Sequence, residues 1–222
     1  MQQKATMREQ ILDSAQRFVQ TRGFHAFSYA GIAAEVGIQK ASIHYYFPAK
    51  TDLGQAMVAR YREELRRQCR RIEIVTPGAD QALQQYAHIF RDMLRSGPDG
   101  AGGRLCVCGV LASEWQALST GMQEEVTGFF RENEAWLARI MDTGRADGCL
   151  HFEGPAFLQA QTFLSSLEGA MQTARVYRDV TLYCAVAHHL LGQMGFHDFD
   201  FNTLVLEPHA TDERGLLVTS PA

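Results

Sequence analysis

Two short helical segments separated by a glycine turn are predicted near the N-terminus of the chain. Residues 28–36 carry apolar side chains at helical spacing and begin with Ser28, a residue type that caps helix N-termini. Gly37 permits a tight turn, and a second segment over residues 39–46 ends before Pro48, because proline removes a backbone donor and restricts the preceding residue. This pattern predicts a helix-turn-helix, whose second helix enters the major groove of DNA.

Helical periodicity also dominates the rest of the chain. A first helix is expected to contain Ile11 and to end at Gly23 in a left-handed conformation. Further helices are predicted over residues 51–74, 80–95, 105–115, 121–143, 155–176 and 181–194. We therefore expect an all-α protein of about nine helices. Residues 1–50 would form a three-helix DNA-binding domain, and residues 51–222 would bind an effector and dimerise, with residues 51–74 as the connecting helix.

Charge is distributed unevenly along the 222 residues. Residues 1–71 contain twelve Lys and Arg against six Asp and Glu, whereas residues 72–222 contain nine against nineteen, within a net charge of −4. A basic N-terminal third favours a polyanionic partner, although the alternating charges of residues 62–71 are also typical of a solvated helix face. Five scattered cysteines, no secretory signal pattern and no apolar run of about 20 residues predict a soluble cytoplasmic protein without membrane contact.

Residues 27–58, FSYAGIAAEVGIQKASIHYYFPAKTDLGQAMV, resemble the DNA-binding head of the tetracycline-repressor (TetR) family of transcriptional regulators. The matching features are Ile32-Ala33, Gly37, Lys40-Ala41-Ser42, Tyr45-Tyr46-Phe47 and Lys50. The resemblance implies a dimeric regulator, by family default a repressor, with no cofactor.

The second helix of the motif carries the candidate DNA contacts. Gln39, Lys40 and Ser42 lie at its start, where polar side chains meet base edges. The resemblance implies that Lys40, His44, Tyr45 and Lys50 contact DNA and that Ser28 touches a phosphate. Ile43, Tyr46 and Phe47 are expected to seat the helix. Gln39 replaces the usual Ser, which weakens the N-cap, and His44 replaces the usual Tyr, which would make a phosphate contact depend on pH.

One short recognition helix reads few base pairs, so sequence specificity requires two heads on a palindromic operator in double-stranded DNA. The predicted helices over residues 155–176 and 181–194 are the candidates for homodimer contacts, as in the resembling family. Gly169, Ala170 and Ala174 would allow close helix approach. Packing within a single subunit would explain the same residues.

An effector site is expected among the aromatic residues of the middle helices. An apolar pocket for a small organic molecule would draw on Tyr86, Phe90, Trp115, Phe129 and the polar Gln161. Taken singly, each of these aromatics is more typical of a core.

The segment GRLCVCG, residues 103–109, offers a second kind of sensor. Cys106 follows Arg104 at the expected first turn of a helix, and both the helix N-terminus and the cation favour a thiolate that reacts with electrophiles. The segment also resembles the sensor region of an electrophile-responsive subgroup of the TetR family. An inert buried cysteine is the alternative.

Parts of the sequence are also compatible with two other functions. A thiol-dependent enzyme would pair Cys106 with a base such as His88, but no P-loop, dinucleotide-binding glycine pattern, H-E-x-x-H or G-x-S-x-G motif is present, and no metal-ligand spacing accompanies C-x-C. A purely architectural DNA-binding protein would not need an acidic, aromatic-rich body. The sequence therefore favours a ligand-responsive regulator without catalytic or metal sites.

Overall fold

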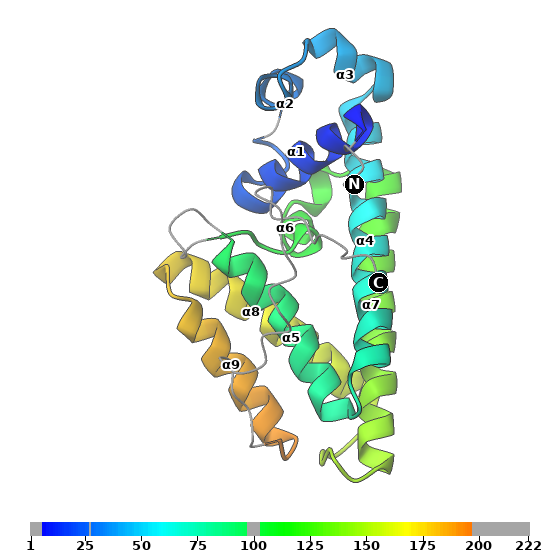
Figure 1. Ribbon diagram of the computed structural model, residues 1–222, viewed down its shortest axis with the longest axis vertical. Helices are drawn as coiled ribbons and strands as arrows, with labels where there is room; N and C mark the ends of the chain where they lie inside the picture. The colour runs from blue at the N-terminus through cyan, green and yellow to red at the C-terminus, as the bar shows by residue number, and fades with distance from the viewer. Residues whose placement is uncertain (1–5, 27, 97–102, 197–222) are drawn as a thin grey trace. The chain divides into compact units, whose positions relative to one another are not determined.

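The computed structural model describes residues 6–26, 28–96 and 103–196, and these form nine α-helices and one short 3-10 helix without a strand (Figure 1). The helices are α1 (Met7–Arg22), α2 (Tyr29–Val36), α3 (Lys40–Tyr46), α4 (Lys50–Val75), α5 (Ala79–Arg95), α6 (Val107–Ser113), α7 (Thr120–Ala146), α8 (Ala156–Tyr177) and α9 (Val180–Gln193), with η1 (Trp115–Ala117) after α6. The predicted all-α class is confirmed. None of the described helices is both long and apolar enough to cross a membrane.

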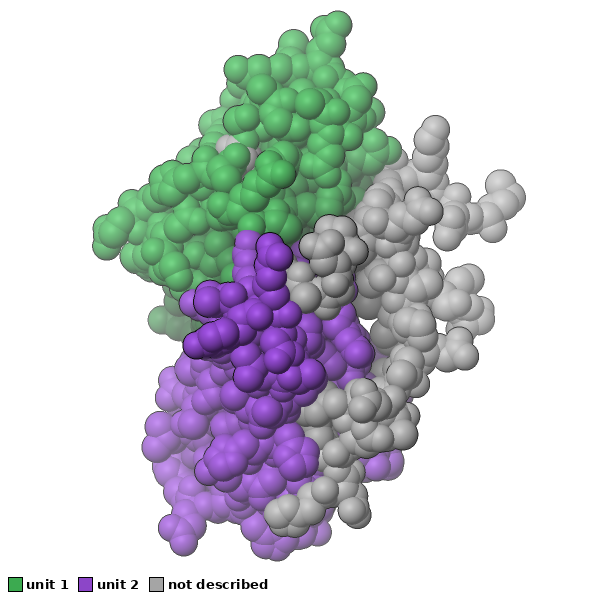
Figure 2. Space-filling model, turned by 90° about the vertical axis from the view of Figure 1, so that its left-hand side faces the viewer, with its two compact units in different colours: residues 1–68, 105–133 green, residues 69–104, 134–222 purple. Residues whose placement is uncertain are grey.

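The described residues divide into two compact units (Figure 2). Unit 1 comprises the described parts of residues 1–68 and 105–133, and unit 2 those of residues 69–104 and 134–222. Both boundaries fall inside long helices, α4 and α7. Unit 1 thus adds the start of α4, all of α6 and the start of α7 to the three N-terminal helices. The predicted boundary at residue 50 separates a DNA-binding part from an effector-binding part. A division into compact units does not test it, so it stays a prediction.

In unit 1, α1 packs against α2 and α6, and α2 packs against α3. Thr6 and Glu9 form a capping box at the start of α1, which satisfies backbone donors that the helix leaves open. Gly37 after α2 is left-handed, as its place in the turn requires. Gly23 after α1 has φ 86° but ψ 168°, so the predicted left-handed helical cap is wrong there, because the chain leaves α1 in an extended direction.

The parts of α4 and α7 that belong to unit 1 lie side by side and run in the same direction. A side chain at Gly121 would collide with Gln55, and the ring of Phe129 stacks on Tyr61, so positions later in α4 meet positions later in α7. Arg62 on α4 lies between two carboxylates of α7, Glu125 and Glu132, and donates hydrogen bonds to both. A face of α4 is therefore fixed by both stacking and ion pairs.

In unit 2, α5 packs against α8 and α9, which are joined by a two-residue turn and lie along each other (Figure 1). The buried hydroxyl of Tyr183 on α9 donates to the carbonyl of Ala87 on α5 at 2.8 Å. Several large apolar side chains of α8 and α9 are nevertheless exposed: Phe157, Leu158, Val176, Tyr177 and Leu182.

Candidate nucleic-acid interface

The helix-turn-helix is built as its sequence predicts. The hydroxyl of Ser28 accepts a hydrogen bond from the backbone N–H of Gly31 at 3.1 Å and so caps α2. Gln39 occupies the N-cap position of α3 and its side chain makes no capping hydrogen bond, which confirms the weak cap expected there. Its amide is exposed and retains its own donors and acceptor for another partner.

The side chains of α3 separate into a buried and an exposed face. Ile43 and Phe47 are buried and seat the helix, as expected. Tyr46 is only partly covered: it is 37% exposed, and its ring meets that of Tyr45 edge-to-face at 5.2 Å between centroids. Tyr45 itself is 83% exposed. Tyr46 therefore contributes less to seating α3 than Ile43 and Phe47, which are buried.

Polar candidate contacts share the exposed face of α3. Gln39, Lys40 and His44 are exposed and Ser42 is half-buried. Their side chains offer amide, amine, hydroxyl and imidazole groups, the types that donate to base edges and phosphates. With Tyr45, five of the seven predicted DNA contacts therefore lie together, four on α3 and Gln39 at its N-cap.

Tyr29 is not among the residues predicted for the site, and it holds the end of α3. It is the first residue of α2 and is buried, and its hydroxyl donates to the carbonyl of Phe47 at 2.8 Å. Burial, with a smaller effect of the Asp52 carboxylate, raises the pKa of Tyr29 to about 12, so the phenol stays a donor at ordinary pH. Its only sequence signal is a tyrosine at an apolar position of a capped helix.

Lys50 lies differently from the other candidate cations. Its amine donates to the carbonyl of Phe24 at 2.8 Å and lies 4.4 Å from the centroid of that ring. Burial lowers the pKa of Lys50, and the carboxylate of Glu114 opposes that shift. Its amine is thus engaged within unit 1, and a phosphate contact by Lys50 stays a prediction.

Glu114, at the end of α6, binds the turn that joins α1 to α2. Its carboxylate accepts hydrogen bonds from the backbone N–H groups of Phe24 at 2.9 Å and His25 at 3.3 Å. A Cβ atom at Gly23 would lie 2.5 Å from one of its oxygens, so glycine is needed for this approach. With Lys50 on the Phe24 carbonyl, both sides of the Phe24 residue are held by charged side chains.

The predicted effector residues are divided between the two units. Tyr86, Phe90 and Gln161 belong to unit 2, whereas Trp115 and Phe129 belong to unit 1. Tyr86, Phe90 and Phe129 are fully buried and stacked or packed on other rings, as core residues are. Trp115 is partly exposed and Gln161 is half-buried.

Cys106 is the N-cap residue of α6 rather than a member of its first turn, and it is 1% exposed. The backbone N–H of the preceding Leu105 donates to the carbonyl of Gln20 in the last turns of α1 at 3.1 Å. α6 is therefore joined to the α1 region at both ends, by this bond and by Glu114. A reagent reaches the buried thiol only if this region opens.

His88, considered as a base for a Cys106 thiol, lies in unit 2 and is buried on α5. Burial, with a smaller effect of Arg91, lowers the pKa of His88 to about 3. Such an imidazole is neutral and weakly basic at physiological pH. Among the described residues, no group of three or more His, Cys, Asp or Glu could hold a metal ion.

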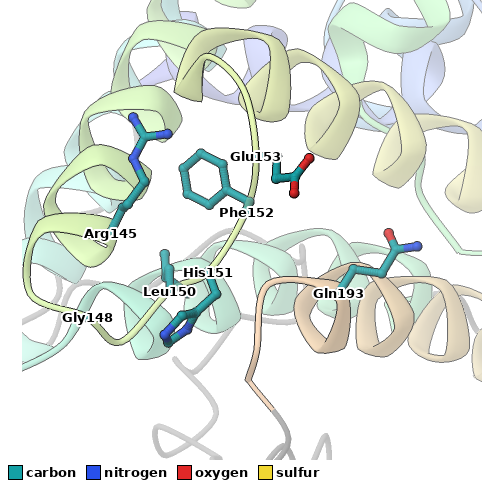
Figure 3. Close-up of a pocket in the computed structure, with 7 residues that line it drawn as sticks. All are labelled: Arg145, Gly148, Leu150, His151, Phe152, Glu153 and Gln193. Carbon is teal, nitrogen blue, oxygen red and sulfur yellow. The ribbon is translucent and has the colours of Figure 1, made fainter.

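A groove of about 520 Å³ lies where the α7–α8 loop meets the end of α9 (Figure 3). The guanidinium of Arg145 lies 4.6 Å from the ring centroid of Phe152 and donates to the carbonyl of Gly154, which fixes the loop. The groove is lined by Arg145, Gly148, Leu150, His151, Phe152, Glu153 and Gln193. None of the predicted effector residues lines it.

Comparison with known proteins places this geometry in a family. The family model for bacterial regulatory proteins of the tetR family matches residues 11–57, which covers the helix-turn-helix. The curated HTH-type transcriptional repressor NemR of Escherichia coli K12 is 26% identical over 186 residues, 82% of this chain and 90% of that protein. Nothing in these similarities supports the thiol-enzyme hypothesis.

Solved structures agree. A TetR-family transcriptional regulator from Agrobacterium tumefaciens is 31% identical, with a TM-score of 0.79 over 84% of this chain and 96% of its own. A TetR regulator from Legionella pneumophila is 26% identical, with a TM-score of 0.78 over 87% of this chain and 100% of its own. Reduced Escherichia coli NemR, 20% identical with a TM-score of 0.74, shares the fold. This chain belongs to the TetR family of bacterial transcriptional regulators.

Proposed function

We propose that this protein is a cytoplasmic, non-enzymatic repressor that binds a palindromic operator as a homodimer and is released by a small organic effector or by modification of Cys106. The observation that carries the proposal is the exposed face of α3, where Gln39, Lys40, Ser42, His44 and Tyr45 lie together on a helix seated by Ile43 and Phe47. A short helix that exposes polar donors and buries its apolar side chains suits the major groove.

The exposed apolar side chains of α8 and α9 support the proposed homodimer. Large exposed apolar surface on a soluble protein commonly marks an interface. At Gly169 on α8 an added Cβ would meet nothing within 4 Å, so a second helix could approach closely there. These two helices contain most of residues 155–176 and 181–194, the predicted dimer segments. Size-exclusion chromatography with light scattering would give a dimer mass, and Gly169→Arg should shift it toward the monomer.

Regulation through α6 is supported by its position in unit 1. Cys106 begins this helix and Glu114 ends it on the turn before α2. The similarity to NemR, a repressor, favours release from DNA as the response. A reversible ligand of the aromatic side chains would also release the protein from DNA if it bound the DNA-free conformation better than the DNA-bound one.

A mobility-shift titration tests the function. The probe is the DNA upstream of the protein's own gene, with a large excess of random duplex as competitor and with or without N-ethylmaleimide. We expect specific binding that the electrophile abolishes in the wild type and in Cys149→Ser, a half-buried control thiol, but not in Cys106→Ser. If random duplex competes as well as the specific DNA does, sequence-specific regulation is contradicted. If the electrophile still abolishes binding in Cys106→Ser, a residue other than Cys106 carries the response.

A further inference from the structure

The imidazole of His44 is held in one protonation pattern by its surroundings. Its Nδ1 lies 3.2 Å from the carbonyl oxygen of Pro48, four residues later. A carbonyl oxygen only accepts hydrogen bonds, so Nδ1 must carry a proton for this contact to form. The ring also packs edge-to-face against Tyr29, with centroids 4.7 Å apart and an interplanar angle of 63°. Both contacts fix the ring on the exposed face of α3.

This arrangement determines what the other ring nitrogen can do. A neutral imidazole has a single N–H, and when that proton lies on Nδ1 the Nε2 atom is an acceptor. A DNA phosphate oxygen is also an acceptor, so neutral His44 has nothing to donate to it. We propose, resting on the proposed DNA-binding function, that His44 contacts a phosphate only as the imidazolium and that each head therefore takes up a proton when it binds DNA.

The neighbouring elements carry other ionisable side chains, among them Tyr29, Asp52 and Lys40. Tyr29, the neighbour from α2, is a buried phenol that donates to the Phe47 carbonyl and stays neutral at ordinary pH. Asp52, in the first turn of α4, accepts a hydrogen bond from the backbone N–H of Ala49 at 3.0 Å. Lys40 lies one turn earlier on α3 and opposes a second positive charge nearby. The negative potential of bound DNA outweighs this repulsion and favours protonation.

The consequence is a DNA affinity that falls as pH rises. The measurement should span about pH 5 to 8, the range in which imidazole side chains in general change charge. A proton taken up on binding lowers the affinity by up to about tenfold for each pH unit of increase. Two heads that each take up one proton give an upper limit of about a hundredfold per pH unit. A tyrosine at this position, which has a hydroxyl donor over the whole range, would not show this dependence.

Fluorescence anisotropy at constant ionic strength, from about pH 5 to 8, tests the inference. The probe is a duplex selected from random sequences by the wild-type protein at pH 6. We expect affinity to fall with pH in the wild type and to be nearly constant in His44→Tyr. His25→Gln is the matched control, because His25 is also exposed in unit 1 but lies 3.4 Å from Glu114. Calorimetry in buffers of different ionisation enthalpy should show proton uptake that His44→Tyr abolishes.

A flat wild-type profile, or an unchanged slope in His44→Tyr, would overturn the inference while leaving DNA binding intact. A slope that disappears in His25→Gln instead would also overturn it and would assign the proton to the α1–α2 turn. Failure of the wild type to select any duplex at any pH would overturn the proposed function itself. Circular dichroism of each variant confirms that the fold is retained.

Discussion

The guanidinium of Arg62 on α4 lies against Gly128 on α7, so closely that a Cβ atom at Gly128 would come within 3 Å of it. The missing side chain lets the guanidinium lie across α7 and reach Glu125 on one side and Glu132 on the other. Glycine normally weakens a helix interior by about 1 kcal/mol relative to alanine. Here the close approach of an arginine accounts for its presence.

Gly128→Ala should therefore have opposite effects in two backgrounds. In the wild type it displaces Arg62 and should lower the free energy of unfolding by about 1–2 kcal/mol. In an Arg62→Ala background it should raise that free energy by about 0.5–1 kcal/mol, because only the helix propensity remains. Urea denaturation of the four proteins measures the cycle. The same sign in both backgrounds would contradict the proposed role of the glycine.

The same cluster predicts a pH effect on stability. Hydrogen bonds from Arg62, and then from Arg66, lower the pKa of Glu132 from 4.5 to about 2. Because the folded pKa is depressed, this carboxylate stabilises the fold above about pH 4.5, and the contribution is lost as pH falls toward 2. Its side chain is 37% exposed, so solvent screening limits the contribution to about 1 kcal/mol or less.

Glu132→Gln tests this effect. The difference in free energy of unfolding between wild type and variant should be present at pH 6.5 and should shrink as the pH falls toward 3. A difference that is constant over this range would show that the charge of Glu132 is not what stabilises the contact.

Glu114→Gln should loosen the turn between α1 and α2. Hydrogen bonds from backbone N–H groups to a carboxylate contribute about 1.5–3 kcal/mol each when partly buried, and a neutral amide oxygen replaces only part of this. We expect a lower melting temperature and faster hydrogen exchange at the amides of Phe24 and His25. Glu124→Gln, an exposed carboxylate on α7, is the control and should change neither.

Lys40 and Lys50 should differ in the salt dependence of DNA binding. Lys40 is exposed, so Lys40→Ala should reduce the slope of log K against log salt concentration by about 0.9 for each protomer, if it neutralises one phosphate. The amine of Lys50 is engaged with Phe24, so Lys50→Ala should weaken binding by loosening the turn, with a smaller change in slope. Equal changes in slope would place both amines on phosphates.

Most of the fold could be predicted from the sequence because its signals are local. Apolar periodicity located the nine described α-helices but not the short 3-10 helix after α6, and Ser28, Gly37 and Pro48 marked boundaries through contacts a few residues apart. The partial exposure of Tyr46 could not be predicted, because it depends on the neighbours that its ring meets in the fold and not on spacing along α3.

The long-range contacts of the site could not be predicted. Glu114 binds backbone groups 89 and 90 residues away, and Tyr29 binds a carbonyl 18 residues away. Neither contact leaves a periodic signal, because backbone N–H and C=O groups are the same for every residue. For the same reason the sequence could name aromatic effector candidates but not how they are grouped: the structure divides Tyr86 and Phe129 between the two units.

Unit 1 is assembled from two stretches of chain, with α6 and the start of α7 completing what the first 68 residues begin. A chimeric regulator made by exchanging N-terminal segments at residue 50 would therefore lack the α6 residues that bind the transplanted α1–α2 turn. The transplanted Phe24 and Gly23 would meet a foreign residue in place of Glu114, and the recipient would keep a carboxylate with no turn to bind. An exchange of the DNA-binding helices that keeps these contacts must therefore include residues 105–133 together with the N-terminal segment.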